Sequence, residues 1–559
     1  MGPRIPRPGR AWGTDGVVSL RRLLSFRAFC AACLVALFGL SLWARVTSLE
    51  TSPATCADEA FFGLQAERLA HGRAISSTTG SYKPVDYVYS VAGAPLHLIF
   101  RPSYALERTP AVLFGLAAVV LCYVFVAREF DRTTGLIAAG LLAVLPIAIM
   151  YARIGWEYSE VPFWTALILA FAARGRRLAL IVSYLFCLHV SPTAVFLAPV
   201  PMCILGARLL PGSPGPRAGR RRPIAVTMAT LAAVVIAAGL NARRNQTTQM
   251  TFAAYGFGPP NWGQFLRLFK HHLLGFCQYG LRESSTLHDW LFWTPCALVL
   301  ALGSWQLVRR RRWERLAVVV GWLAALAGYH LVVGPGGFHY LLPRYGLFLT
   351  VPTVISVAIL AESLLVPPTR PAFVAARRLQ VVALIAVGFV LVMSYKLNYF
   401  DLYYHWSERP ESFWTLATEA DEPIRHVATA IGRDLEGAGR APSTVIVAED
   451  WWCAKPLEYF LARRGGVEVG RLDLIPLESR PDVVARRLRG GGYVLAVAGG
   501  PVEAWTRALF PAESLRHWHV QEGRYPRYAL YRLRRRPDEP ESCDECLARG
   551  DRPAASARR

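Results

Sequence analysis

Long apolar runs recur along the chain and are separated by short polar segments. A helix that crosses a membrane needs about 20 mostly apolar residues. Eleven runs approach that length, so we expect eleven spans, at residues 28–48, 109–127, 133–150, 159–173, 178–190, 193–207, 223–241, 289–308, 316–333, 345–365 and 379–399. Prolines at positions 192 and 199 blur the ends of the fourth to sixth runs. The pattern predicts a multi-pass α-helical membrane domain over residues 28–399.

Beyond residue 400 the pattern changes to short apolar segments bounded by turn residues. Three of them, 443–450, 491–500 and 528–534, favour strands, whereas 454–464 and 481–490 have helical spacing. Strands that alternate with helices predict an α/β domain over 400–534. Residues 535–559 are polar and lack an apolar pattern, which is typical of disorder.

The distribution of Lys and Arg predicts the orientation of these spans in the membrane. The sequence has a net charge of +23 and is 53% hydrophobic. Lys and Arg gather in the N-terminal segment 1–27 and in alternate connections, at 128–132, 174–177, 208–222, 309–315 and 370–378. Because such residues mark cytoplasmic loops, we expect a cytoplasmic N-terminus, outer loops at 49–108, 151–160 and 242–288, and an extracytoplasmic α/β domain. No basic patch is interleaved with a nucleic-acid-binding fold, so the charge indicates orientation rather than a nucleic-acid partner.

The outer segments hold the candidate chemistry. "ADEAFFGLQAERLAHG" (57–72) predicts a short helix along the membrane interface that ends at Gly72 and has Phe62, Ala66 and Leu69 on its apolar face. Asp58 then lies at its N-terminal end, beside Glu59. The acid either stabilises the helix dipole, by less than about 1 kcal/mol, or takes part in catalysis.

Each further candidate in these segments also has a structural interpretation. Lys83 could extend its amine to the interface, Arg153 and Glu157 could form an i,i+4 ion pair, and His339, Arg344 and Tyr345 could anchor the tenth span. The spans themselves hold few ionisable groups, and those few lie at span ends. A transporter is expected to place such groups near the midplane, so their position favours an enzyme that works at the outer surface.

In this order, the pieces resemble the membrane-embedded C-type glycosyltransferases (GT-C fold), which take sugars from polyprenyl-phosphate carriers. The likeness is to the branch with the protein O-mannosyltransferases, the lipid A aminoarabinose transferase and the Rgt-type transferases. It rests on "ADEAFFGLQAERLAHG", "YKPVDYVY", "RTPAVLFG", "YARIGWEY" and "RYGLFLTVP", and covers 28–200 and 316–365. The chain departs from the family pattern at Val85 and Asp86, where a second Pro and a Leu are usual, and at Glu157, where Asp is common.

The resemblance implies roles for these residues. Asp58 is the base that deprotonates the acceptor hydroxyl, with Glu59 as its neighbour or substitute. Lys83, Arg153 and Arg344 stabilise the leaving phosphate, and Glu157, His339 and Tyr345 contact substrate or a metal. One base and a phosphate leaving group suffice for inversion at the sugar carbon. No cofactor is required, and a divalent metal is compatible with the acids and histidines.

The sequence therefore predicts a plasma-membrane transferase that moves a hexosyl or pentosyl group onto a hydroxyl of a lipid, glycan or protein of the cell envelope. Its partners would be the polyprenyl-phosphate-linked sugar, the acceptor and membrane lipids. Two alternatives stay open: a transporter or flippase of lipid-linked saccharides, and a membrane scaffold with an outer binding domain.

Overall fold

The structure, a computed structural model, describes residues 15–47, 49–50, 57–77, 85–209, 221–244, 286–333, 346–364, 418–437, 444–464, 466–488, 491–497, 499–510, 515–520 and 528–533. The predicted span at 379–399, most of the loop 242–288 and the predicted disordered tail 535–559 lie outside the described residues.

The chain divides into two compact units. The helical unit comprises Met1–Thr55 and Gln65–Thr418, and the sheet unit comprises Cys56–Leu64 and Glu419–Arg559. The division falls within helix α2 (Ala57–Ala70), so the first half of α2 belongs to the sheet unit. The sheet unit thus includes a segment of the loop predicted over 49–108.

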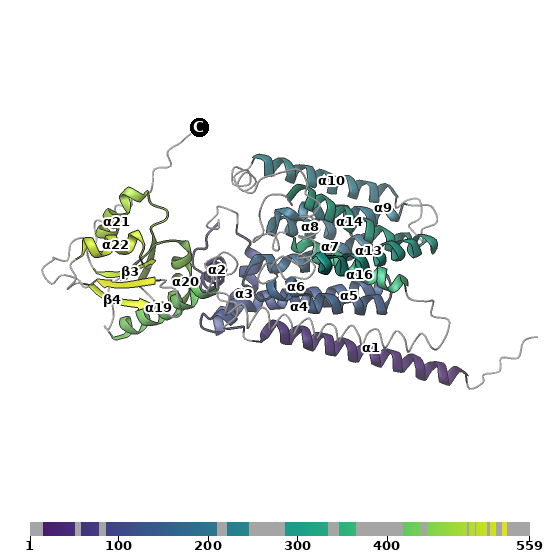
Figure 1. The fold of residues 1–559 in the computed structure, drawn as a ribbon, viewed down its shortest axis with the longest axis horizontal. Helices are drawn as coiled ribbons and strands as arrows, with labels where there is room; N and C mark the ends of the chain where they lie inside the picture. Colours follow the sequence, from purple (N-terminus) through teal and green to yellow (C-terminus); the bar gives the residue numbers. More distant parts are fainter. Residues whose placement is uncertain are drawn as a thin grey trace, which may run out of the picture. The chain divides into compact units, whose positions relative to one another are not determined.

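Helices that lie side by side make up the helical unit (Figure 1). Their bounds, with those of the short 3₁₀ segments (η) and of the shared helix α2, are α1 Asp15–Val46, α2 Ala57–Ala70, α3 Tyr87–Ile99, α4 Tyr104–Glu129, α5 Arg132–Val144, α6 Pro146–Tyr151, η1 Glu157–Glu160, α7 Val161–Arg174, α8 Arg177–Val190, η2 Pro192–Leu197, α9 Pro199–Ala207, α10 Arg221–Arg244, α13 Thr286–Arg309, α14 Trp313–Val333, η4 Leu347–Leu349 and α16 Thr350–Leu364. Within the described ranges, four are long and apolar enough to cross a membrane: Ala28–Val46, Tyr104–Glu129, Pro223–Leu240 and Leu347–Leu364. These coincide with four of the predicted spans.

Prolines divide two of the predicted spans. The run 133–150 is two helices, α5 and α6, because a residue before proline avoids the helical conformation and Leu145 is extended, with ψ of 120°. Pro146 also lacks the N–H that the carbonyl of Leu142 would need. The guanidinium of Arg45 replaces it, donating to the carbonyls of Leu142 (3.4 Å) and Ala143 (2.9 Å). In the same way, 193–207 comprises η2 and α9.

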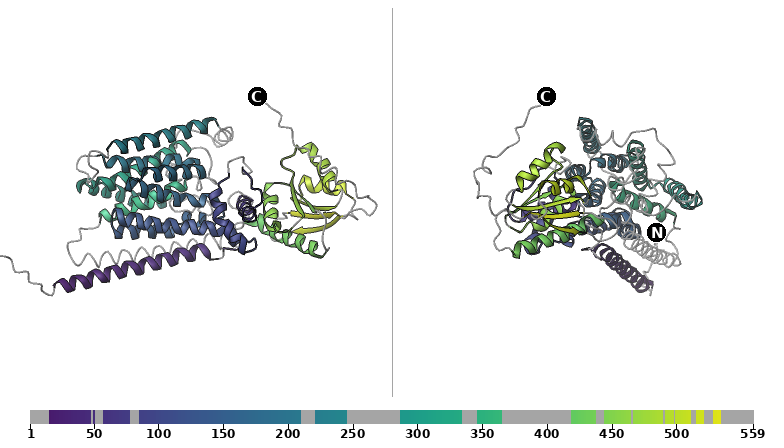
Figure 2. Two further views of the ribbon diagram at one scale, coloured as in Figure 1. Left: turned by 180° about the vertical axis from the view of Figure 1, so that it is seen from behind. Right: turned by 60° about the vertical axis from the view of Figure 1, so that its left-hand side comes forward.

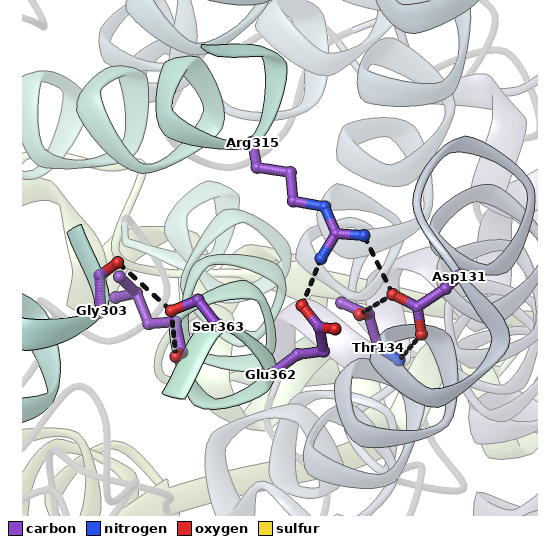
Figure 3. Close-up of polar contacts among 7 residues, drawn as sticks. Asp131, Thr134, Gly303, Arg315, Glu362 and Ser363 are labelled. Atoms are coloured by element: carbon purple, nitrogen blue, oxygen red, sulfur yellow. Dashed lines mark hydrogen bonds and ion pairs between the residues drawn. The ribbon is translucent and has the colours of Figure 1, made fainter. Parts of the chain in front are cut away.

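Ion pairs join several of the predicted cytoplasmic connections at one end of the helical unit. Arg315, at the start of α14, donates to Asp131 in the α4–α5 turn over 3.0 Å and to Glu362 near the end of α16 (Figure 3). Arg174 pairs with Glu129 over 3.5 Å. The connections 128–132, 174–177 and 309–315 therefore lie at the same end of the bundle, as the charge pattern requires.

The sheet unit has one five-stranded mixed sheet with the strand order β2-β1-β3-β5-β4. β1 is parallel to β2 and β3, and β5 is antiparallel to β3 and β4. The elements are α19 Thr418–Gly437, β1 Thr444–Ala448, α20 Trp451–Leu461, β2 Val467–Arg471, η7 Leu477–Ser479, α21 Arg480–Arg487, β3 Gly492–Val497, α22 Pro501–Leu509, β4 Leu515–Val520 and β5 Tyr528–Leu533. The predicted strands correspond to β1, β3 and β5, and the predicted helices to α20 and α21. β2, β4, α19 and α22 were not predicted.

Helices cover both faces of this sheet (Figure 2). Side chains alternate along a strand, so Tyr493 and Leu495 of β3 face α19 and α20, whereas Val494 and Ala496 face α21 and α22. The crossover from β1 to β2 through α20 and the crossover from β2 past β1 to β3 through α21 run in opposite directions. They therefore use opposite faces of the sheet, as right-handed connections require.

Candidate active site

The first half of α2 presents Asp58 and Glu59 in its first turn. The predicted helix over 57–72 is confirmed: α2 ends at Ala70, and Gly72 follows with φ of +63°, a conformation suited to glycine. Asp58 is half-buried and Glu59 is buried. Ala60 and Leu64 pack against Tyr459 of α20 within the sheet unit.

The expected placement of α2 along an interface, with one apolar face, does not match its burial. Besides Phe62 and Ala66, the polar residues Glu59, Gln65 and Glu67 are buried. Within the helical unit, His97 of α3 lies 3.0 Å from Glu67, and both side chains are buried. α2 is therefore buried along polar as well as apolar positions.

Arginines surround the C-terminal end of α1 in the helical unit. Arg153 is fully buried and donates from Nη1 to the carbonyl of Ala44 over 2.9 Å. Arg108, also fully buried, donates to the carbonyl of Leu49 over 2.8 Å. The last carbonyls of a helix lack intrahelical donors and carry a partial negative charge, so the Arg153 contact holds the end of α1 to the 151–156 turn. The Arg108 contact joins Leu49, which follows α1, to α4.

Arg153 and Glu157 do not lie on one helix. α6 ends at Tyr151, and η1 begins at Glu157. The helical spacing assumed for an i,i+4 ion pair is therefore absent. The turn between them packs tightly on α4, since a Cβ at Gly155 would lie 3.0 Å from Cγ of Glu107.

Three buried carboxyl groups gather beside this turn. The charges of Asp86 and Glu157 both act on Glu160. Asp86 caps α3 by accepting from the Val88 N–H over 2.9 Å, and Glu160 accepts from Trp164 Nε1 over 2.8 Å. Only Glu157 was a predicted site residue. The usable sequence signal for Asp86 was its cap position directly before the aromatic helix that begins at Tyr87.

The remaining predicted site residues, Lys83, His339, Arg344 and Tyr345, lie outside the described residues. Asp58 and Glu59 belong to the sheet unit, whereas Arg153 and Glu157 belong to the helical unit. In the described ranges, no group of three or more His, Cys, Asp or Glu side chains is arranged to hold a metal ion.

Solved structures that are similar to this chain include those of ArnT and of an archaeal oligosaccharyltransferase. The chain is similar to the crystal structure of ArnT from Cupriavidus metallidurans in the apo state, with 14% identity over 93% of this chain and 98% of that chain and a TM-score of 0.49. For the same protein bound to undecaprenyl phosphate, the identity is 15%, the coverage is again 93% and 98%, and the TM-score is 0.48. The oligosaccharyltransferase of Archaeoglobus fulgidus in the apo form gives 12% identity over 84% of this chain and 69% of that chain, with a TM-score of 0.47.

No family model matches the chain, and no curated protein matches it. ArnT is the lipid A aminoarabinose transferase, one of the proteins that the sequence motifs resemble. At these identities and scores, no residue role or activity is carried over to this chain.

Proposed function

We propose that this protein is a glycosyltransferase that moves a sugar from a polyprenyl-phosphate carrier to a hydroxyl acceptor at the outer face of the plasma membrane. One observation supports this most: a group of buried ionisable side chains, among them Glu107, Arg108, Arg153 and Glu160, lies at one end of the helical unit. Most of the exposed arginines, apart from Arg73 and Arg101, lie at the other end, where the buried ionisable groups Arg315 and Glu362 form an ion pair. α4 spans the two ends, with Arg108 in its second turn and Glu129, the partner of Arg174, in its last. Under the positive-inside rule the buried end is the outer one.

The reaction needs a base, and we assign that role to Asp58. Its carboxylate takes the proton of the acceptor hydroxyl as the oxygen attacks the anomeric carbon. The bond from that carbon to the phosphate oxygen breaks, and its electron pair leaves with the polyprenyl phosphate. Direct displacement of this kind inverts the sugar carbon. Burial of Glu59 beside Asp58 supports a partly dry site, in which electrostatic interactions are stronger than in water.

The leaving phosphate gains negative charge, and we assign Lys83, Arg153 and Arg344 to its stabilisation. Arg153 fits this role by burial, since a cation shielded from water acts most strongly. Its bond to the Ala44 carbonyl gives it a structural role as well. We assign Glu157 to substrate positioning, together with Asp86 and Glu160, because sugar hydroxyls are donors that carboxylates accept. His339 and Tyr345 are further substrate contacts in this proposal.

The sugar and the acceptor are both identified by what the cell envelope loses when the gene is deleted. Cells with and without the gene are compared by mass analysis of envelope lipids, glycans and proteins. The proposal predicts the loss of one sugar substituent, its return with the wild-type gene, and no return with Asp58→Asn at equal protein abundance. An unchanged envelope under conditions where the protein is made would contradict it. If the protein were a flippase, its deletion would stop the lipid-linked saccharide from crossing the membrane. Vesicle transport assays detect such movement.

A further inference from the structure

Four consecutive arginines form the turn between α13 and α14. Arg309, Arg311 and Arg312 are exposed and Arg310 is half-buried. Within the described residues, none of the four has a carboxylate partner. The fifth arginine of the segment, Arg315, differs: it is buried against Asp131 and Glu362 (Figure 3). Asp131 and Glu362 are thus engaged by Arg315. The four arginines form a largely exposed cationic cluster, which we call the hairpin tip.

Arg311 occupies a backbone position that suits glycine. Its φ is +54°, and among the described non-glycine residues it alone has a positive φ. The turn is a Schellman-type end to α13, in which the N–H of Arg312 donates to the carbonyl of Leu307 over 2.9 Å and that of Arg311 to Val308 over 3.0 Å. Glycine is the usual residue here because a side chain costs free energy in the left-handed conformation.

Neither membrane insertion nor the helix dipole explains why arginine, rather than glycine, occupies position 311. The positive-inside rule needs cationic charge, and the neighbouring arginines supply it in any backbone conformation. The dipole at the end of α13 is complemented by one or two cations. A fourth guanidinium in a strained position, among like charges, points to an anion that the cluster binds.

Two tryptophans flank the arginines and indicate where that anion lies. Trp305 of α13 is 54% exposed and Trp313 at the start of α14 is 38% exposed. The guanidinium of Arg309 stacks over the Trp305 ring at 5.3 Å from its centroid. Exposed tryptophan is typical of the level of the lipid headgroups, and Arg binds phosphate oxygens in pairs. Glu314 is the exposed acid nearest in sequence, and it opposes an anion.

We propose that the hairpin tip binds the phosphodiester headgroup of an anionic membrane phospholipid. The guanidinium groups of Arg309 to Arg312 hold the phosphate, and Trp305 and Trp313 lie at the same depth as the glycerol region. This interaction is independent of sugar transfer.

Native mass spectrometry of the full-length protein in detergent tests this proposal. Phosphatidylglycerol and phosphatidylcholine are titrated separately, and we expect retention of phosphatidylglycerol with at least tenfold preference. A juxtamembrane arginine contributes about fivefold in affinity, so the triple variant Arg309→Gln, Arg310→Gln, Arg312→Gln should lose about two orders of magnitude. A matched variant with three exposed arginines of the sheet unit changed, Arg433→Gln, Arg463→Gln and Arg486→Gln, should bind as the wild type does.

Arg311→Gly separates ligand binding from folding. Without lipid it should raise the thermal midpoint by about 1–2 °C, because strain is relieved, and it should weaken phosphatidylglycerol binding about fivefold. Equal binding of the two lipids would overturn the proposal, as would unaltered binding by Arg311→Gly or by the triple variant. Displacement of the lipid by millimolar glycerol phosphate would also overturn it, since the site would then recognise free phosphate.

Discussion

The Nη1 atom of Arg153 donates a hydrogen bond to the backbone carbonyl of Ala44 over 2.9 Å. This bond joins the turn after α6 to the last turn of α1, 109 residues earlier in the chain. It also means that a residue proposed to stabilise the donor phosphate is part of the framework of the helical unit. Its two roles call for an experiment that separates them.

Arg153→Lys and Arg45→Lys form a matched pair for this purpose. Both arginines are fully buried and donate to backbone carbonyls, Arg45 to Ala143 at the end of α5 and Arg153 to Ala44 in the last turn of α1. Each change should therefore destabilise the protein by about 1–3 kcal/mol. Only Arg153→Lys should also raise the KM for the polyprenyl-phosphate sugar, about tenfold, which corresponds to about 1.4 kcal/mol. Thermal unfolding and donor titration measure the two effects. Equal donor KM values in the two variants would show that Arg153 has only a structural role.

Gly115 of α4 permits the close approach of the 151–156 turn. A Cβ there would lie 2.5 Å from Cβ of Ala152 and 3.2 Å from Nε of Arg45. Gly115→Ala should therefore force the turn away from α4 and destabilise the protein by about 1–3 kcal/mol. Gly39→Ala in α1 is the control, because nothing lies within 4 Å of its added Cβ, and it should stabilise by about 0.5–1 kcal/mol. Thermal midpoints that move in the same direction would show that the packing at Gly115 is not as described.

Asp131 makes the stability of the helical unit depend on pH. Burial raises the pKa of this carboxyl, but hydrogen bonds from Thr134 and the charge of Arg315 outweigh burial and hold it below its ordinary value. A lowered pKa in the folded state stabilises the protein above the unfolded-state value, about pH 4, and this contribution is lost as the pH falls through the folded-state pKa.

Asp131→Asn tests this contribution without loss of the helix cap, since Asn caps as well as Asp and the Thr134 N–H keeps an acceptor. At pH 7 the variant should be less stable by about 1–3 kcal/mol. The difference from wild type should shrink once the pH falls below about 4. Unfolding in detergent at pH 7 and pH 3.5 measures it, and a difference that grows toward low pH would refute the assignment.

The sheet unit should depend on the first half of α2. Ala60 and Leu64 cover Tyr459 of α20, so Leu64→Ala should cost about 2–4 kcal/mol and speed hydrogen exchange in α20. Leu474→Ala is the control, since Leu474 is 63% exposed. A fragment of residues 419–534 alone should be less stable than one with Cys56–Leu64 fused to it. Equal stability of the two fragments would contradict the assignment of this segment to the sheet unit.

Periodicity and charge predicted much of this architecture. The helix over 57–72 was foreseen with its C-terminal glycine at Gly72, and β1, β3 and β5 were foreseen from their apolar runs. β2 has only two apolar residues, Val467 and Val469, between polar ones, and it lies at the sheet edge. Such a strand takes its structure from its neighbour β1 rather than from its own pattern.

The gathering of Asp86 with Glu157 and Glu160 could not be predicted from the sequence. Asp86 is far from the other two along the chain, and their proximity depends on how α3, α4 and the 151–160 turn fold together. Pro146, in contrast, was visible in the sequence, and the preference of a preceding residue for extended backbone could have divided the predicted span at Leu145.

The release of free polyprenyl phosphate tests the central claim most directly. Wild-type protein, Asp58→Asn and Glu59→Gln are reconstituted in liposomes with a panel of polyprenyl-phosphate sugars, the undecaprenyl carrier first, and an envelope extract as acceptor. Mass spectrometry follows both the free carrier and the new glycosidic product. We expect the wild type to form both in equal amounts, and Asp58→Asn, with an unchanged thermal midpoint, to be slower by at least about 100-fold. Wild-type rates in Asp58→Asn, or movement of the donor across the bilayer without a new glycosidic bond, would contradict the account.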